Sequence, residues 1–227
     1  GDLFGLVNVI DALVVLLVLA VVVAGAALVF GGSGEPEPEQ DLATTNVTLD
    51  LGPQPEYIVA EMNEGDSYSP GGNSNLTITD IHLSPQDDQT HVTIRAELRG
   101  QPNDNGEGLT YADAPPRLGR TLEIATNRYE ASGQIRAIGD GNSLNRETTT
   151  VVLQDTVPAA DAREITAGDE VRLAGRTVAT VTDVAAYATS DPTQRTVYVE
   201  AELETYTQRG ERRFGNTQLR RGQTITL

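Results

Sequence analysis

The chain has 227 residues, of which 33 are Asp or Glu and 16 are Arg; it has no Lys, no Cys and a formal net charge of −17. The absence of Cys excludes disulfides, thiolate metal sites and cysteine nucleophiles. The negative field disfavours nucleic acid as a partner, because nucleic-acid binding depends on neutralising phosphates with cations.

Residues 1–30 are predicted to form one long apolar helix. Residues 12–30 include no charged side chain, and as a helix they would be about 28 Å long, close to the roughly 30 Å of a bilayer core. The first cation of the chain is Arg95, and 14 acidic residues precede it. Apolar runs without neighbouring cations are typical of the exported side of a membrane. We therefore expect the helix to anchor a chain whose exterior faces out of the cell.

Three positions of this helix are candidate contacts with other helices. Asn8 and Asp11 are three residues apart and share one helix face. Gly25 lies among small residues that allow another helix to approach closely. The alternative for Asp11 is a position at the membrane interface, where it has no helix partner.

Gly1 stands directly before the apolar run, where a Met would be expected, and this arrangement resembles type IV pilins after removal of their leader. The resemblance covers residues 1–30 and points to archaeal pilins, since bacterial pilins place a Glu nearer the N-terminus than Asp11. It implies a helix that anchors in the membrane first and then packs against its copies in a filament core.

Residues 31–43, GGSGEPEPEQDLA, are predicted to be a solvated spacer. Gly and Pro prevent regular structure there, and the Pro-Glu alternation keeps the chain extended. Beyond it we expect a first β unit at residues 44–138, a linker at residues 139–147 and a second β unit at residues 148–227.

The two expected β units are copies of one another, with a spacing of 103 to 105 residues. Five blocks recur in the same order: 44–49 with 148–153, 65–66 with 168–169, 79–81 with 182–184, 94–98 with 199–203, and 119–122 with 222–225. Apolar and polar residues alternate at residues 92–99 and again at 197–204, which is typical of strands with one buried face. The predicted fold is therefore mainly β, with one long N-terminal apolar helix and two tandem β-sandwich or barrel-like units.

The second unit ends at Leu227, in the middle of a block that should be a paired strand. An unpaired strand leaves an open sheet edge. One hypothesis is that Ile225 and Leu227 belong to a strand that a neighbouring subunit covers by strand addition. The alternative is that a strand of the first unit closes both units within one molecule.

The sequence shows no catalytic motif, including G-x-S-x-G, the P-loop and H-E-x-x-H. Asp80, His82 and His91 suggest a metal site, but the second copy has Ala185 at the position of His82, which favours an ordinary surface role. Residues 103–108, NDNGEG, lack the ligand spacing of an EF-hand and are more simply a turn built on Asn-Gly. We expect no enzyme activity, no metal and no cofactor.

Two N-x-[ST] sequons begin at Asn46 and Asn75. Each sequon alone is a weak signal in a chain rich in Thr. Both lie in the region expected outside the cell, so they are candidate glycosylation sites of a surface protein.

The leading hypothesis is a structural subunit of an extracellular pilus-like filament, with apolar helices in the core and acidic β units on the outer surface. Its partners would be copies of itself, and the membrane before assembly. The alternative is a single-span, membrane-anchored surface protein with a binding or adhesion role. The use of Arg alone among many acids resembles proteins of halophilic archaea, where salt screens net charge. The architecture is also similar to uncharacterised haloarchaeal families with one anchor and a β-rich exterior.

Overall fold

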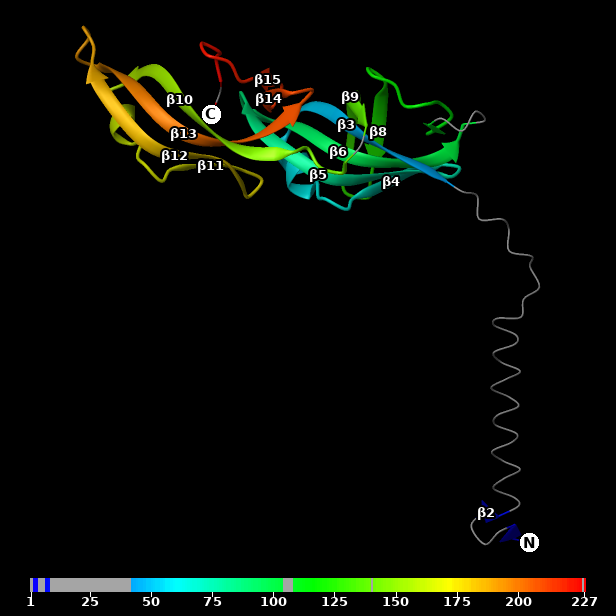
Figure 1. Ribbon diagram of the computed structural model, residues 1–227. Helices are drawn as coiled ribbons and strands as arrows, with labels where there is room; N and C mark the ends of the chain where they lie inside the picture. Colours follow the sequence, from blue (N-terminus) through cyan, green and yellow to red (C-terminus); the bar gives the residue numbers. More distant parts are fainter. Residues whose placement is uncertain (1, 4–6, 9–41, 104–107, 140, 226) are drawn as a thin grey trace. The chain divides into compact units, whose positions relative to one another are not determined.

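The computed structural model describes residues 2–3, 7–8, 42–103, 108–139, 141–225 and 227 (Figure 1). It separates into two compact units, residues 1–40 and residues 41–227. Strands make up most of the described residues, which confirms the predicted β-rich character.

The predicted N-terminal helix is contradicted where residues 1–30 are described. β1 (Asp2–Leu3) and β2 (Val7–Asn8) form an antiparallel pair, in which Asp2 lies opposite Asn8. No helix among the described residues is long and apolar enough to cross a membrane. The predicted transmembrane and pilin-like helix, and membrane anchoring through it, are therefore wrong; residues 9–30 lie outside the described residues.

The physical reason lies in the type of apolar run. Residues 2–8 are too few for hydrophobic periodicity to distinguish a strand from a helix. Val, Asn and Gly, which make up four of the five residues 5–9, all have lower helix propensity than Ala or Leu. Hydrophobicity was therefore a poor guide to the backbone conformation at this end of the chain.

The first sheet of the larger unit has seven strands and forms a nearly closed barrel (Figure 1). Their order is β4-β5-β6-β3-β9-β8, with β7 paired to β6. The outer strands β4 and β8 approach each other. The elements are β3 (Ala43–Gln54), α2 (Glu56–Glu61), β4 (Ser67–Gly71), β5 (Ser74–Gln86), β6 (Gln89–Pro102), β7 (Leu109–Thr110), β8 (Thr121–Ala125) and β9 (Glu130–Gly139).

The second sheet has six strands and forms half of a barrel. Its order is β11-β12-β13-β14-β15, and β10 pairs with the other side of β13. The elements are β10 (Arg146–Pro158), the 3-10 helix η1 (Asp161–Arg163), β11 (Glu170–Leu173), β12 (Arg176–Ala188), β13 (Gln194–Gln208), β14 (Glu211–Phe214) and β15 (Thr217–Gln218). All neighbouring strands in both sheets are antiparallel.

The sequence repeat has a counterpart in the geometry of the two sheets. The strand order β4-β5-β6-β3 of the first sheet corresponds to β11-β12-β13-β10 of the second. The amide of Gly65 donates to the carbonyl O of Ile78 over 2.8 Å, and 103 residues later the amide of Gly168 donates to Val181 over 2.8 Å. In both sheets a register shift follows directly after this bond. The two copies therefore share their turns and strand pairing.

The copies differ in how much apolar surface they bury. The first sheet surrounds most of the core, whose members include Val47, Leu49, Leu76, Ile78, Ile81, Leu83, Ile94, Leu98, Ile124 and Ile135. The second has a cluster of four buried residues: Ala179, Ala201, Leu203 and Phe214. Among the described residues the second sheet has no counterpart of β8 and β9, so it encloses less. Val178 of β12 is buried in the first core and joins the two sheets.

Two buried polar side chains of β5 also fasten the first sheet to the second. His82 donates from Nε2 to the carbonyl O of Glu204 on β13 over 2.8 Å. Asp80 accepts a hydrogen bond from the amide of Leu144 over 2.8 Å and lies 3.1 Å from Nε of Arg146 on β10. Two of the three positions that the sequence suggested as metal ligands, Asp80 and His82, therefore hold the two sheets together.

Replacing Gly215 with alanine should lower the free energy of unfolding by about 2 kcal/mol, from backbone strain and overpacking together. Gly215 has a φ of +58°, and a Cβ there would collide with the side chain of Ser84 on β5. Chemical denaturation measures the loss. Gly222→Ala is the matched control, because Gly222 also has positive φ (+78°) but has open space around its Cβ position. Equal losses in the two variants would contradict the close contact.

Candidate functional site

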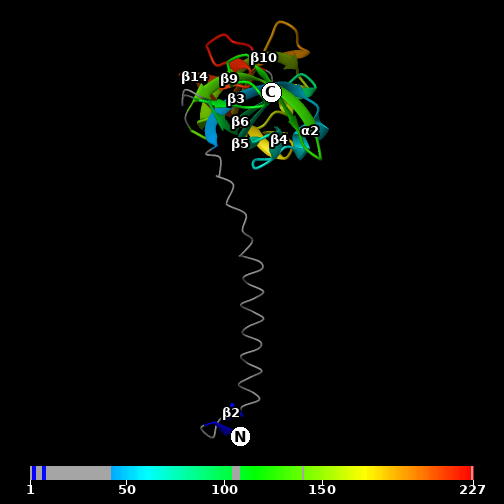
Figure 2. The same ribbon diagram turned by 90° about the vertical axis from the view of Figure 1, so that its right-hand side faces the viewer.

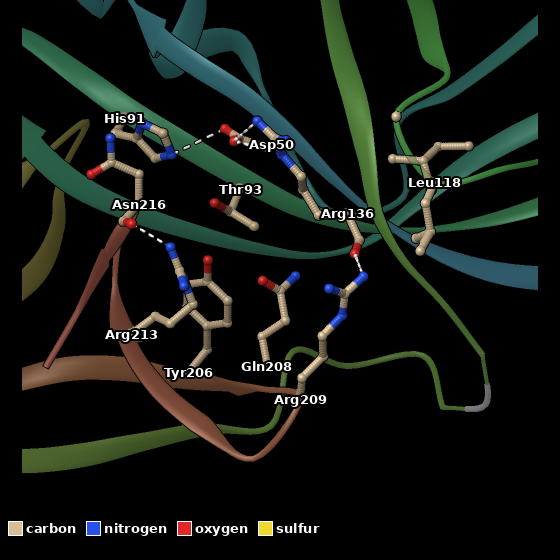
Figure 3. A pocket seen from close by; sticks show the side chains of 12 residues that line it. Asp50, His91, Thr93, Leu118, Arg136, Tyr206, Gln208, Arg209, Arg213 and Asn216 are labelled. Atoms are coloured by element: carbon tan, nitrogen blue, oxygen red, sulfur yellow. Dashed lines mark hydrogen bonds and ion pairs between the residues drawn. The ribbon is translucent and has the colours of Figure 1, made fainter.

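A pocket of about 490 Å³ lies where β13 and β14 face the first sheet (Figure 3). One wall comes from β3, β6 and β9, and the other comes from β13, β14 and the turns beside them. The polar side chains that surround it include Asp50, His91, Arg136, Gln208, Arg209 and Arg213. Its volume falls within the roughly 300–1,000 Å³ of small-molecule sites.

The first wall is organised around Asp50 on β3. Its Oδ1 lies 3.1 Å from Nε2 of His91, and its Oδ2 lies 3.1 Å from a guanidinium nitrogen of Arg136. Burial opposes the ionisation of Asp50, but His91, the amide of Gly52 and Arg136 outweigh it and lower its pKa to about 2. Asp50 is therefore a carboxylate at neutral pH and orients Arg136 at the edge of the pocket.

The second wall carries two further arginines. Arg209, with a φ of 54°, begins the two-residue turn between β13 and β14 and donates to the carbonyl O of Arg136 over 2.9 Å. Arg213 projects from β14 on the same side of the pocket (Figure 3). Nε of Arg213 and Nε2 of Gln208 are buried and have no hydrogen-bond acceptor among the described residues. A buried donor without an acceptor costs about 1–3 kcal/mol, so a ligand that supplies an acceptor to these two donors is favoured.

The charge balance of the pocket is opposite to that of the chain. Three guanidinium groups line the pocket, against the carboxylate of Asp50 and that of Glu211, which lies 3.9 Å from Arg213, whereas the whole chain has a net charge of −17. Guanidinium groups present a planar fork of donors that matches the oxygens of a carboxylate, sulfate or phosphate. The pocket is therefore suited to a small anion.

The imidazole of His91, in the first wall, is not arranged to transfer a proton to or from a ligand in the pocket. Nδ1 of His91 lies 3.0 Å from Oε1 of Gln86, and Nε2 faces Asp50. Both ring nitrogens are thus engaged within the chain, and neither is directed at the pocket as a general base requires. The arrangement suits binding.

The structure assigns the predicted metal-site residues to separate contacts. His82 bonds to the backbone of Glu204, whereas His91 pairs with Asp50. No group of three or more Asp, Glu or His among the described residues is arranged to hold a metal ion. Residues 104–107 of the calcium-like sequence 103–108 lie outside the described residues.

The predicted glycosylation sites lie on strands of the first sheet. Asn46 on β3 is paired on both sides, opposite Glu97 of β6 and Gly139 of β9. Asn75 on β5 donates from Nδ2 to Oγ of Ser69 over 3.0 Å. Glycosylation of either residue stays a prediction.

The other predicted residues lie away from the pocket. Asn8 is in β2, and Asp11 and Gly25 lie outside the described residues. Ile225 packs against the core of the second sheet, and Leu227 is 39% exposed; neither is in a strand. An inter-subunit strand at this end of the chain stays a prediction.

The sequence reasoning missed the arginine pocket. Its only local signal is the run of cations Arg209, Arg212 and Arg213 in a chain that is otherwise acidic. Asp50 and Arg136 join this run only through the pairing of β3 with β9 and the packing of the second sheet. No spacing within the sequence predicts that meeting.

Residues 1–92 match the model of a family described as a domain of unknown function, DUF4330. No curated protein and no solved structure matches the chain. The matched residues end in β6, before the strands that supply the three arginines of the pocket. The resemblance to archaeal pilins and to haloarchaeal surface proteins is untested by these findings and stays a prediction.

Proposed function

We propose that the β-rich unit is a non-catalytic binding module that takes a small anionic ligand in the arginine-lined pocket. The observation that carries the proposal is the convergence of Arg136, Arg209 and Arg213 beside two buried donors that lack acceptors. An oxyanion supplies both the negative charge and the missing acceptors. Burial of these groups strengthens each hydrogen bond relative to water.

The net charge of the chain restricts which anions can bind. A polyanion such as nucleic acid must approach along a large surface and meets the field of 33 acidic residues. A small ligand inside the pocket meets mainly the three nearby guanidinium groups, because salt screens more distant charges within about 10 Å. The ligand class is therefore a small anion with a carboxylate, sulfate or phosphate group.

This proposal keeps the binding role of the alternative hypothesis and leaves out its membrane-anchoring helix. The predicted filament subunit stays a prediction that no finding tests. Anion binding depends only on residues 41–227 and is independent of how the N-terminal unit is used.

Titration of the full chain with sodium glucuronate or sodium sulfate at an ionic strength of about 0.1 M should show saturable binding at one site, measured by isothermal titration calorimetry. Arg209→Gln should weaken binding by about tenfold or more, because a hydrogen bond to a charged group is worth roughly 1.5–3 kcal/mol. Comparison of the two salts distinguishes a carboxylate ligand from a sulfate.

Arg172→Gln is the matched control. Arg172 on β11 is 63% exposed and pairs with Glu170 away from the pocket, so its loss changes the net charge equally and should leave binding unchanged. The proposal fails if the wild type binds neither anion, or if the two variants weaken binding equally.

A further inference from the structure

The second sheet has an open edge at β10. In the first sheet the corresponding strand, β3, is central, since it pairs with β6 on one side and with β9 on the other. Among the described residues, β10 pairs with β13 alone. Figure 2, turned by 90°, again shows β10 at the margin of the β-rich unit. The position that β9 fills beside β3 is therefore unfilled beside β10.

The middle of this edge lacks the features that normally protect a free strand; the charged residues and the proline of β10 lie toward its two ends. Proteins blunt edges with charges, proline or a bulge. β10 pairs with β13 over 13 consecutive positions, from Arg146 to Pro158, without a register shift. Residues 148–154, TTTVVLQ, are uncharged in a chain of net charge −17. The middle of β10 is therefore a regular, uncharged template for another strand.

An exposed apolar face adjoins the same edge. Val152 on β10 is 63% exposed, and Tyr187 on β12 is 58% exposed. Tyr198 on β13 lies between these strands, and its ring packs edge-on against Tyr187 with centroids 5.7 Å apart. An added strand beside β10 would extend this face.

We propose that a second copy of this chain fills the open edge, with the two β10 strands antiparallel about a two-fold axis. An axis at Thr150 places Val152 opposite Thr148 and Val151 opposite Thr149. These Val–Thr pairs suit adjacent strands. In this register Glu147 lies opposite Leu153, and no two carboxylates of the strands face each other. A two-fold pair consumes both open edges, so the assembly closes as a dimer.

The charge of the chain gives this dimer a distinctive dependence on salt. Two copies of net charge −17 repel each other at low ionic strength, whereas the contacting strands carry no charge at their centre. Screening by salt removes the repulsion and strengthens apolar contacts at the edge. Dimer formation is therefore expected to increase from 0.1 M to 2 M KCl.

Analytical ultracentrifugation of the full chain tests the proposal. The wild type should be dimeric in 2 M KCl, and Val152→Glu should lower the association constant at least tenfold. Tyr57→Glu is the matched control, because Tyr57 is 73% exposed on α2. This variant introduces the same negative charge at a position outside the β10 edge. Circular dichroism and thermal unfolding verify that both variants are folded.

A mixture of Val152→Glu and Thr148→Arg should regain dimers, because in this register residue 152 of one copy lies opposite residue 148 of the other and the introduced charges attract. A wild type that is monomeric in 2 M KCl overturns the proposal. Equal association constants for Val152→Glu and the wild type would also overturn it, because the interface would then lie elsewhere. Growth into open-ended assemblies would contradict the closed dimer. Arg209→Gln should dimerise normally, which separates this proposal from anion binding.

Discussion

Acidification from pH 7 to pH 4 should lower the free energy of unfolding, and His82 should account for about 3 kcal/mol of that loss. Burial lowers the pKa of His82 from 6.5 to about 4, because a charged imidazole between the sheets loses its hydration. Between these two pH values the unfolded chain binds a proton at His82 and the folded chain does not. Stability is therefore full above pH 6.5 and falls as the pH decreases toward 4.

Urea unfolding at a series of pH values measures this dependence. His82→Ala should be less stable at pH 7, because the carbonyl of Glu204 loses its donor, but it should lose about 3 kcal/mol less than the wild type on going to pH 4. Ala185→His is the matched control, since Ala185 is the repeat counterpart on the less buried β12. Ala185→His should lose as much stability as the wild type between pH 7 and pH 4. If His82→Ala also loses as much as the wild type, protonation of His82 is not the cause of the loss.

Replacing Asp80 with alanine should destabilise the protein by about 3 kcal/mol, because it leaves a buried amide without an acceptor and removes one of the three carboxylates that pair with Arg146. Asp80 is only 4% exposed and is contacted by the amide of Leu144 at 2.8 Å and by Nε of Arg146 at 3.1 Å. The Arg146 side chain is 40% exposed, so most of the loss is expected from the amide. Equilibrium unfolding at pH 7 measures the change.

The sequence repeat supplies a control at the equivalent position. Asp183 stands 103 residues after Asp80 and is exposed on β12, so Asp183→Ala should change stability by less than about 0.5 kcal/mol. Asp80→Asn keeps one acceptor for the amide and should recover part of the loss. Similar losses in both alanine variants would mean that Asp80 does not fasten the sheets.

Local patterns in the sequence predicted the strands better than they predicted the helix or the site. Alternation at residues 92–99 predicted one buried face, and Val92, Ile94 and Leu98 are fully buried. Thr93 and Arg95 on the opposite face are buried as well, so the prediction of a single buried face is wrong for this part of β6. The repeated Gly-Asp pair marked a turn that has the same backbone hydrogen bond in both copies. The predicted helix over residues 1–30 is wrong where the structure describes these residues, since Asp2–Leu3 and Val7–Asn8 are strands.

The pocket could not be predicted because its residues are distant in the sequence. Arg136 reaches Asp50 only through the register of β9 against β3, and Arg209 reaches the same wall only through packing between sheets. Likewise, Asp80 and His82 share a strand face, which suggested a metal site. Their actual partners, Arg146 and Glu204, come from the second copy.

The central place of β3 has a consequence for synthesis of the chain. β3 is the first strand of its sheet to leave the ribosome, yet its second neighbour, β9, ends 85 residues after it, at Gly139 rather than Gln54. At roughly 5–20 residues per second, β3 waits about 4–17 s with one side unpaired. The acidic residues of the segment just before it repel neighbouring nascent chains during that interval, when the centre of the future barrel is most open to wrong partners.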